Sequence, residues 1–377
     1  MRGRVAILTT NHLEPSGSRQ VYGGAERYGM ELSRLLLEMG YRVEWWQIGT
    51  GWVREMIPGV PIRSVPVSEG SYQTLPALNQ TFAEQAIDAD FAIYFVMFLA
   101  YPGALSRSIS VSHGIYWDHP LVDSSLPTDG DRQEWSRRLS LAIGSVRKVV
   151  SVDTNTINWV RATWPELAAK FRYVPNFVDL EAFAPPPSGE RSDGTGALRV
   201  VFPRRATTVR GIHEAGQAAQ WLTEGHPDVQ VHFVGRAHDD GTERRLAMWA
   251  GRSEGRLYHY WLPPHLMPLA YRHADVAWIP TKACEGTSLS CLEAMASGCA
   301  VITTAVGGLS DLVQDGYSGL LIEPTARALT DATLRLRADP ALRRRLGGHA
   351  REVAETFGID RWRRGWAATL QDAFGRH

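Results

Sequence analysis

Short apolar segments alternate with stretches of helical periodicity along most of the chain, which is the pattern of an α/β protein with parallel sheets. The first apolar segment covers residues 4–10, and a loop of small and polar residues leads from it to a predicted helix at 25–39. The apolar residues of that helix repeat on one face, and Gly40 ends it before a second strand at 42–48. This β–loop–α–β order predicts a Rossmann-like unit at the start of the chain.

The remaining elements form two groups. Residues 51–89 contain many prolines and predict irregular structure. Further strands of the first group are expected at 91–97, 109–112 and 148–152, with a helix from Asp153 onward. The second group has expected strands at 198–202, 229–234, 257–261, 276–279, 300–303 and 320–322, and expected helices at 213–224, 242–251, 265–273, 326–357 and 359–374. The arginine-rich helical stretch 326–357 is expected to be a solvated outer face. The second group therefore predicts another Rossmann-like sheet.

Residues 180–197 separate the two groups and have the composition of a linker. They contain APPP and SGERSDGTG, and proline, glycine and polar residues are typical of domain boundaries. We expect an N-terminal domain at 1–179, a C-terminal domain at 198–358 and a final helix within 359–377. A chain of 377 residues is long enough for two domains.

Composition narrows the classes of function. The formal net charge is zero, so no long-range field favours nucleic acid, and we expect no nucleic-acid partner. The three cysteines, Cys284, Cys291 and Cys299, lack the spacing of a metal site or a disulfide framework, which indicates a reducing compartment. The N-terminus has no signal-peptide pattern, and the longest apolar run, 91–100, is too short to span a bilayer. We expect a cytoplasmic protein; contact with the inner face of a membrane and the oligomeric state stay open.

The stretch 280–304 carries the densest chemistry in the sequence. After an apolar strand it passes through a turn of small residues, Gly286, Thr287 and Ser288, into a helix with Leu289 on its apolar stripe. Thr287 or Ser288 can cap that helix. The helix start offers free backbone N–H groups and the positive end of a dipole, which suits a diphosphate.

Two acids lie in the same stretch. Glu285 is in the loop and Glu293 is inside the helix, so roughly 12 Å separates them along the helix axis. That separation could span a sugar at one end and a nucleoside ribose at the other, with the diphosphate between them. The alternative is a solvated helix with two surface acids, because charged residues usually lie outside.

The central stretch resembles the glutamate–seven residues–glutamate signature of retaining glycosyltransferases of the GT-B fold, glycosyltransferase family 4. The family form is close to EGFGLPxLEAMAxGxPVI, and this chain has EGTSLSCLEAMASGCAVI, with Thr287 and Ser288 where Phe and Gly are common. The following GGLSDLV and DGYSGLLIEP also fit. The resemblance implies two Rossmann-like domains that face each other across a cleft, with a C-terminal helix that crosses back to the first domain.

Two segments of the first group resemble the family as well. YGGAER resembles the family's first turn, where backbone lies near the donor sugar and the acceptor, so Gly23 and Gly24 are expected as backbone contacts. Glycine permits such close approach, although most Gly-Gly pairs are ordinary turns. His113 follows an expected strand, where an α/β sheet binds ligands, and the family's His-Gly there points at the donor sugar. A lone histidine in this position could equally be a core residue.

The segment PRRATTVRG resembles the family's arginine–five residues–lysine-glycine segment, which grips the diphosphate. Arg205 and Arg210 have the common spacing, and Arg204 with Arg210 matches a longer variant. Arginine pairs well with phosphate oxygens, but here Arg210 replaces the lysine, which keeps the charge and changes the geometry. From the residues alone, an exposed basic loop is the alternative.

Two other motifs have competing interpretations. Tyr116 and Trp117 could form a stacking platform for an acceptor sugar or belong to the core. Asp129, Gly130 and Asp131 resemble the metal-binding DxD motif of another glycosyltransferase architecture, but no strand precedes them, and we interpret them as a turn.

The resemblance implies transfer of a sugar from a nucleotide-diphosphate sugar to a hydroxyl acceptor with retention of configuration. Glu285, Arg205, Arg210 and His113 are the expected catalytic residues; the expected substrate-binding residues are Gly23, Gly24, Arg204, Gly286, Thr287, Ser288, Leu289 and Glu293. Glu285 would accept from the sugar hydroxyls and Glu293 from the ribose, while the leaving phosphate oxygen serves as the base.

On this interpretation, no metal and no cofactor are expected beyond the nucleotide-sugar donor, because arginines neutralise the leaving diphosphate. The acceptor could be a polysaccharide, a lipid-linked glycan or a small metabolite. Two alternative functions remain at this point: a sugar-nucleotide 2-epimerase of the same architecture, and an inactive nucleotide-sugar-binding partner of another transferase.

Overall fold

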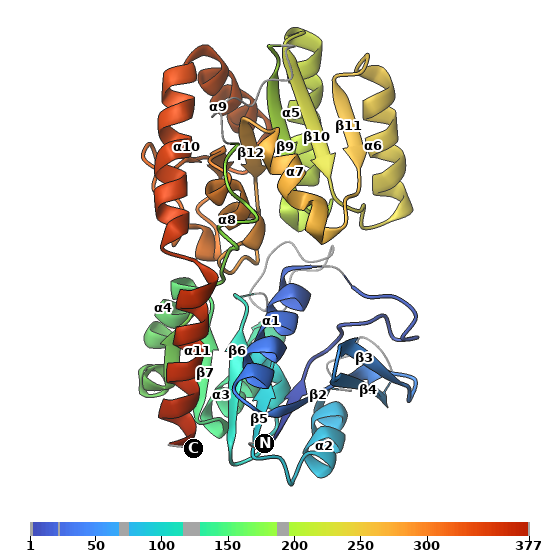
Figure 1. Ribbon diagram of the computed structural model, residues 1–377, viewed down its shortest axis with the longest axis vertical. Helices are drawn as coiled ribbons and strands as arrows, with labels where there is room; N and C mark the ends of the chain where they lie inside the picture. Colours follow the sequence, from blue (N-terminus) through green and yellow to red (C-terminus); the bar gives the residue numbers. More distant parts are fainter. Residues whose placement is uncertain (1–2, 22, 68–74, 116–128, 187–195, 376–377) are drawn as a thin grey trace. The chain divides into compact units, whose positions relative to one another are not determined.

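A computed structural model describes residues 3–21, 23–67, 75–115, 129–186 and 196–375 of the chain. The chain divides into two compact units. Unit 1 comprises Met1–Asp118, Pro127–Pro175 and Arg363–His377, and unit 2 comprises His119–Leu126 and Asn176–Trp362. Each unit is built on a largely parallel sheet covered by helices, which confirms the predicted α/β class (Figure 1). The limits 1–179 and 198–358 for two domains stay a prediction.

The sheet of unit 1 has its strands in the order β3-β4-β2-β1-β5-β6-β7-β8. Its strands are β1 (Arg4–Leu8), β2 (Arg42–Gly49), β3 (Val53–Ile57), β4 (Val60–Pro66), β5 (Phe91–Tyr94), β6 (Ser108–Ser112), β7 (Lys148–Ser151) and β8 (Phe171–Tyr173). Neighbouring strands are parallel apart from the pair β3–β4. The strand order reverses between β1 and β5, and ligands of open α/β sheets bind at the carboxyl ends of strands next to such a reversal.

Helices cover both faces of this sheet. They are α1 (Gly24–Glu38), α2 (Leu75–Gln85), α3 (Asp129–Ser145), α4 (Thr154–Thr163) and the final helix α11 (Ile359–Phe374). Side chains alternate along a strand, so Ala6 and Leu8 pack with residues of α2 and α3, such as Phe82 and Leu139. Val5 and Ile7, which alternate with these residues, are equally buried and face the opposite side.

Helix α11 returns to the N-terminal part of the chain, as the family resemblance implied. Its Arg363 Nε donates to Glu31 Oε1 on α1 at 3.0 Å, and its Trp366 Nε1 donates to the hydroxyl of Tyr28 at 2.7 Å. At its end, Phe374 stacks on Phe91 with ring centroids 4.6 Å apart. Trp366 and Tyr28 are both fully buried, so the hydrogen bond between them lies in the core of unit 1.

The sheet of unit 2 has the strand order β11-β10-β9-β12-β13-β14. Its strands are β9 (Leu198–Phe202), β10 (Val229–Val234), β11 (Leu257–Tyr260), β12 (Val276–Ile279), β13 (Ala300–Thr303) and β14 (Leu320–Leu321). Every recorded pair is parallel. The order reverses between β9 and β12, so the loops that follow these two strands are the expected ligand-binding edge.

The core of unit 2 has two layers. Val200 and Phe202 of β9 pack on the face covered by α5 (Ile212–Gly225), α6 (Asp240–Arg252) and α9 (Ala326–Ala338). Val201, between them in sequence, packs on the other face against α7 (Met267–Arg272) and α8 (Leu289–Ala296). The alternation of a fully buried strand thus fixes which helices lie on each face.

Two sequence predictions for the first half of the chain were wrong. Residues 51–89 are not irregular, because they contain β3, β4 and α2. Pro58 and Gly59 form the tight turn of the β3–β4 hairpin, and Gly59 has φ +79°, which glycine adopts without strain. The DGD triplet at 129–131 is not a turn but the beginning of α3, where acids suit the positive end of the helix dipole.

The helical stretch 326–357 is two helices rather than one. Pro340 cannot continue a helix, so α9 ends at Ala338 and α10 (Pro340–Glu355) begins with Asp339 as its cap. Neither helix is a purely solvated face, because Leu336 of α9 and Leu346 of α10 are fully buried. Likewise, 265–273 is a short 3-10 turn followed by α7, and the strand expected at 91–97 ends at Tyr94.

Helix α10 packs closely on the end of α8 through a glycine, and this contact yields a stability prediction. A Cβ atom at Gly347 would lie 2.3 Å from the carbonyl oxygen of Gly298, whereas a Cβ at the adjacent Gly348 would meet nothing within 4 Å. We expect Gly347→Ala to destabilise the protein by about 1–3 kcal/mol through overpacking. Gly348→Ala is the matched control and should stabilise by about 0.5–1 kcal/mol. Urea unfolding checks both; equal effects of the two substitutions would contradict the packing.

Candidate active site

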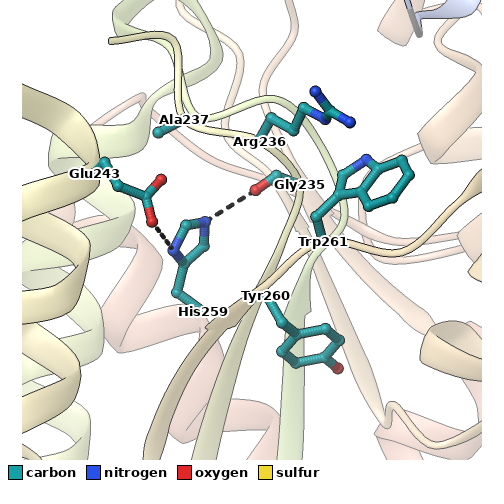
Figure 2. A pocket seen from close by; sticks show the side chains of 7 residues that line it. All are labelled: Gly235, Arg236, Ala237, Glu243, His259, Tyr260 and Trp261. Carbon is teal, nitrogen blue, oxygen red and sulfur yellow. Dashed lines mark hydrogen bonds and ion pairs between the residues drawn. The ribbon is translucent and has the colours of Figure 1, made fainter. Parts of the chain in front are cut away.

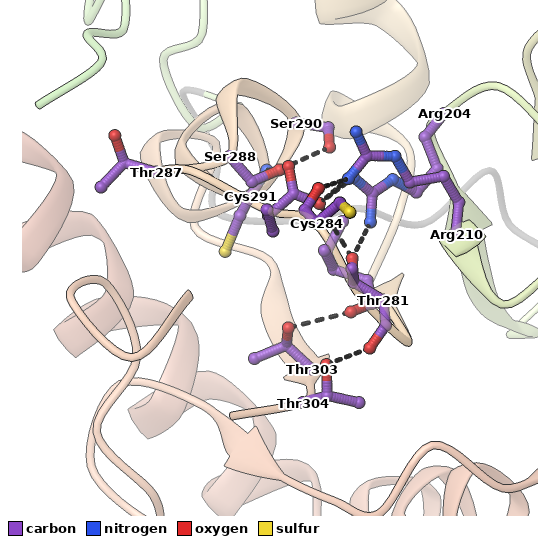
Figure 3. A network of polar contacts seen from close by, with 12 residues as sticks. Arg204, Arg210, Thr281, Cys284, Thr287, Ser288, Ser290, Cys291, Thr303 and Thr304 are labelled. Atoms are coloured by element: carbon purple, nitrogen blue, oxygen red, sulfur yellow. Dashed lines mark hydrogen bonds and ion pairs between the residues drawn. The ribbon is translucent and has the colours of Figure 1, made fainter. Parts of the chain in front are cut away.

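A buried polar network of unit 2 lies at the reversal of strand order. Arg204 follows β9 by two residues, and Thr281 follows the neighbouring β12 by two residues. Because the carboxyl ends of parallel strands meet at one edge of the sheet, both side chains reach the same place. Figure 3 shows Arg204, Arg210 and Thr281 converging there, next to the N-terminus of α8.

Glu285 is the centre of this network. Its Oε2 accepts from Arg204 Nη2 at 2.6 Å and from the Thr281 hydroxyl at 2.9 Å, and it is also paired with Arg210 Nη1. Arg204 Nη1 donates to the same Thr281 hydroxyl at 2.5 Å. The side chains of Arg204 and Glu285 are only 7% and 8% exposed, so these charges are held away from water.

The charges of this network depend on one another. Burial alone raises the pKa of Glu285, but the Arg210 and Arg204 guanidiniums act more strongly together and bring this pKa below its ordinary value of 4.5. An isolated buried charge would be very costly, whereas a paired and hydrogen-bonded one is tolerated. Glu285 therefore stays ionised at neutral pH and keeps Arg204 buried. Arg210 is more exposed, at 29% of its side chain.

The loop that carries Glu285 is fixed by close backbone contacts. Cys284 has φ +56°, a conformation that is uncommon for a residue with a side chain. Gly308 donates its N–H to the Glu285 carbonyl at 2.9 Å, and a Cβ at Gly307 would lie 2.0 Å from that oxygen. The Gly-Gly pair after β13 is thus required for the approach of two backbone segments.

Helix α8 begins where the sequence predicted. Ser288 is its N-cap, and the Ser288 hydroxyl accepts from the Cys291 N–H at 3.4 Å. Thr287 and Leu289 are buried on either side of the cap. Asn176 N–H donates to the Thr287 hydroxyl at 2.8 Å, which ties the start of unit 2 to this loop.

Glu293 lies inside α8 and is also buried, with 4% of its surface exposed. The Tyr271 hydroxyl donates to Glu293 Oε2 at 2.8 Å, and Tyr271 itself is fully buried on α7. Neither Glu285 nor Glu293 is a solvated surface acid, so that alternative is wrong for both.

Of the two adjacent arginines, Arg204 rather than Arg205 makes the ion pair with Glu285. Arg205 is exposed, and the longer spacing, Arg204 to Arg210, is the one that brings two guanidiniums to one carboxylate. The structure thus brings together Arg204, Arg210, Glu285 and the α8 start, and it does not place Arg205 on the Glu285 carboxylate.

The predicted residues of unit 1 lie near its own reversal of strand order. Gly23 is the extended N-cap of α1, and Gly24 is the first helical residue after β1. His113 follows β6 and packs edge-on against Tyr28, with ring centroids 5.3 Å apart, and at a tilt against Phe95, at 4.8 Å. Tyr116 and Trp117 lie outside the described residues.

His113 is a neutral imidazole at physiological pH. Burial lowers its pKa to about 4, against the opposing effect of the Phe95 carbonyl. His113 Nε2 lies 3.1 Å from that carbonyl, so Nε2 carries the proton and donates, and Nδ1 is left as an acceptor. His113 can therefore accept a hydrogen bond but cannot act as a cationic acid.

A separate cavity of about 420 Å³ lies in unit 2, where β10 and β11 end (Figure 2). It is lined by Gly235, Arg236, Ala237, Glu243, His259, Tyr260 and Trp261. The Arg236 guanidinium lies 4.5 Å from the Trp261 ring centroid. His259 Nε2 pairs with the Gly235 carbonyl at 2.9 Å, and His259 Nδ1 lies 3.3 Å from Glu243 Oε1. The lining offers a flat aromatic surface with a cation on it.

The sequence predicts Gly235 and Arg236 only as a turn after a strand, and it indicates neither this lining nor Thr281 as part of a site. The available signal was position: Thr281 follows β12 at the reversal of strand order, and Arg236 and Trp261 follow β10 and β11 at the same carboxyl edge of the sheet. Within the described part of the chain, no three His, Cys, Asp or Glu side chains are grouped so that they could hold a metal ion. Among the described helices, none has the length and apolar character needed to cross a bilayer.

The ion pairs of Glu285 give the second prediction. Glu285→Gln leaves Arg204 buried without a counter-ion, and we expect it to lower the free energy of unfolding at pH 7 by about 3–5 kcal/mol. Because the folded-state pKa of Glu285 is lowered, its contribution is present above about pH 4.5 and is lost as pH falls through the folded-state value.

The free energy of unfolding of Glu285→Gln should accordingly fall less between pH 7 and pH 3 than that of the wild type. Denaturant unfolding between pH 3 and pH 7 measures both quantities, with the exposed Glu224→Gln as control. A Glu285→Gln curve that runs parallel to the wild-type curve would contradict the assignment.

The third prediction concerns His113. In an NMR titration of the imidazole C–H signals, we expect the His113 midpoint near pH 4, because burial disfavours the imidazolium. A midpoint close to the ordinary value of 6.5 would show that the ring is solvated or paired with a negative charge.

Comparison with known proteins agrees with the fold and the site. Residues 192–353 match the family described as Glycosyl transferases group 1. D-inositol 3-phosphate glycosyltransferase of Geodermatophilus obscurus is 31% identical over 95% of this chain and 87% of the relative. The protein of the same name from Kribbella flavida is 28% identical over 98% of this chain and 93% of the relative.

Solved structures show the same fold at low identity. Sucrose-phosphate synthase from Thermosynechococcus elongatus has a TM-score of 0.78 and 22% identity, with 99% of both chains covered. Anabaena HepE in complex with UDP-glucose has a TM-score of 0.74 and 16% identity over 98% of this chain and 99% of that one. These likenesses establish the two-sheet architecture that the sequence predicted. The chain belongs to the group 1 family of glycosyl transferases, glycosyltransferase family 4, and is a retaining glycosyltransferase with the GT-B fold.

Proposed function

We propose that this enzyme transfers a glycosyl group from a nucleoside-diphosphate sugar to a hydroxyl acceptor, with the donor held by unit 2. The observation that carries the proposal is the buried network of Arg204, Arg210 and Glu285 beside the start of α8. Two guanidiniums and a helix N-terminus at one sheet edge make a site for an anion with two phosphates.

The two arginines stabilise the leaving group in this proposal. The bond between the anomeric carbon and the phosphate oxygen breaks, and negative charge grows on the departing diphosphate. Arg204 and Arg210 meet that charge without reorganisation, because Glu285 already holds them in place. The acceptor oxygen bonds to the anomeric carbon on the same face, and its proton passes to the departing phosphate oxygen.

Glu285 serves the sugar as a hydrogen-bond acceptor rather than as a nucleophile. Its Oε2 already receives three donors, which reduces the electron density available for attack at carbon. Its Oε1 can still accept from a sugar hydroxyl. His113, being neutral with an acceptor Nδ1, is proposed to accept from another sugar hydroxyl.

The nucleoside is proposed to lie between α8 and the cavity at the ends of β10 and β11. Glu293, held by Tyr271, would accept from the ribose hydroxyls. The Arg236–Trp261 pair at the cavity would receive the base, because a planar ring stacks on indole and guanidinium faces. The structures of HepE, which have complexes with UDP-glucose and with UDP, support a nucleotide of this type as the first to test.

The acceptor is proposed to be a hydroxyl of a polysaccharide, a lipid-linked glycan or a small metabolite. The curated relatives named above are D-inositol 3-phosphate glycosyltransferases, so D-inositol 3-phosphate is the first acceptor to assay. We also propose that transfer is independent of metal ions, since arginines supply the positive charge, and that activity survives EDTA. Cys284, Cys291 and Cys299 are not joined in disulfides, which supports a cytoplasmic location.

Adjacent arginines provide the fourth prediction. We expect Arg204→Ala to lower kcat/KM by about 100- to 1,000-fold, the range seen when one transition-state donor is removed. Arg205→Ala, with the same change of residue one position on, should lower it by less than about tenfold. Initial rates of nucleoside-diphosphate release, with UDP-glucose and GDP-mannose as donors and D-inositol 3-phosphate as acceptor, measure this. A larger loss with Arg205→Ala than with Arg204→Ala would contradict this assignment and would indicate that Arg205 contacts the diphosphate.

A further inference from the structure

The two oxygens of the Glu285 carboxylate are in different environments. Three donors, from Arg204, Arg210 and Thr281, contact Oε2. Within the described residues, no donor is recorded on Oε1. A glutamate carboxylate normally turns easily about its last torsion, and either oxygen can accept. Here three directed donors on one oxygen select one orientation.

Thr281 is the one neutral member of this set, and it contacts two charged groups at once. Its hydroxyl donates to Glu285 Oε2 at 2.9 Å and accepts from Arg204 Nη1 at 2.5 Å. The hydroxyl proton therefore has one direction only, since Arg204 can donate but cannot accept. Hydrogen bonds to ionised groups are the stronger kind, so the threonine rotamer and the carboxylate plane fix each other.

The backbone of Thr281 is fixed as well. The residue is fully buried, its carbonyl accepts from the Thr304 hydroxyl at 2.6 Å, and its N–H donates to the Ile279 carbonyl at 2.8 Å. Figure 3 shows the Thr303 and Thr304 side chains lying below Thr281, on the strand side of the network. The backbone of Thr281 is thus anchored to the ends of β12 and β13, and its hydroxyl is oriented by Glu285 and Arg204.

We propose that Thr281 is a specificity-determining positioning residue, which turns Glu285 so that Oε1 alone accepts from one hydroxyl of the donor sugar. The inference rests on the proposed function, in which Glu285 contacts the sugar. A site built to pair with a particular hydroxyl discriminates strongly against a sugar that lacks it at that position, because the buried acceptor is then left unpaired. An acceptor oxygen free to turn would discriminate less.

The test compares variants that differ in one group. Thr281→Val keeps the shape and removes the hydroxyl, and Thr281→Ser keeps the hydroxyl. Thr303→Val is the matched control, because Thr303 is equally buried and its hydroxyl donates only to the Ile279 carbonyl. Glu285→Gln reports on the proposed sugar contact itself. A melting curve for each variant establishes that it is folded before binding is measured.

The readout is the ratio of dissociation constants within pairs of donors that differ at one carbon. The pairs are UDP-glucose with UDP-galactose, UDP-N-acetylglucosamine with UDP-N-acetylgalactosamine, and GDP-mannose with GDP-glucose, each titrated calorimetrically. The pair that contains the tightest wild-type ligand is used. We expect Thr281→Val to reduce this ratio at least tenfold, while Thr281→Ser and Thr303→Val keep it within threefold.

The outcomes separate the two levels of the argument. The contact between Glu285 and the donor sugar in the proposed function is overturned if Glu285→Gln leaves the ratio unchanged. It is also overturned if the wild type does not discriminate within any pair. If Glu285→Gln abolishes discrimination but Thr281→Val leaves it intact, only the role of Thr281 is overturned. A loss in Thr281→Val that Thr281→Ser restores supports the proposal, since a general packing defect would not be restored by the smaller residue.

Discussion

One buried carboxylate organises the candidate site. Two guanidiniums repel each other, and Arg204 is almost entirely removed from water, so neither its burial nor its closeness to Arg210 could persist without Glu285. The ion pairs are therefore required for the fold of this edge of the sheet, apart from any role in the reaction. Because the same pairs hold the arginines with their remaining N–H groups oriented in advance, the folded state already contains the positive charge that a departing diphosphate needs.

The local sequence explains why this carboxylate can be held there. Parallel strands β9 and β12 are neighbours, and the loops that follow them meet at the reversal of strand order. Gly307 and Gly308 allow a second backbone segment to touch the Glu285 loop, which no larger residue would permit. In unit 1, burial lowers the pKa of His113 and keeps this side chain neutral, whereas Glu285 stays charged because it is paired. Glu285 thus acts through a fixed charge and His113 through a fixed acceptor.

Much of the architecture could be predicted from the sequence, because buried parallel strands are short apolar segments and glycines or caps end the helices. Strands β10, β12 and β13 and helix α11 have the predicted limits, and Ser288 is one of the two predicted caps. The β3–β4 hairpin was not predicted, because prolines at 58 and 61 obscured two short strands. The break at Pro340 was missed because helical periodicity continues on both sides of it.

The sequence predicted which segments contribute to the site, but it did not predict which side chains of those segments point into it. The acids and Arg210 have a recognisable spacing, but whether Arg204 or Arg205 turns inward depends on how the backbone leaves β9, which spacing does not determine. Thr281 and Trp261 belong to no recognisable motif. Their positions matter because each follows a strand at the carboxyl edge of the sheet.

A crystal structure of this enzyme with a bound nucleoside diphosphate measures the central claim most directly. The account predicts the terminal phosphate within hydrogen-bond distance of both Arg204 and Arg210, with its oxygens facing the backbone N–H groups at the start of α8 and Glu285 still paired with Arg204. A diphosphate bound elsewhere on unit 2, with neither arginine in contact with it, would contradict the account.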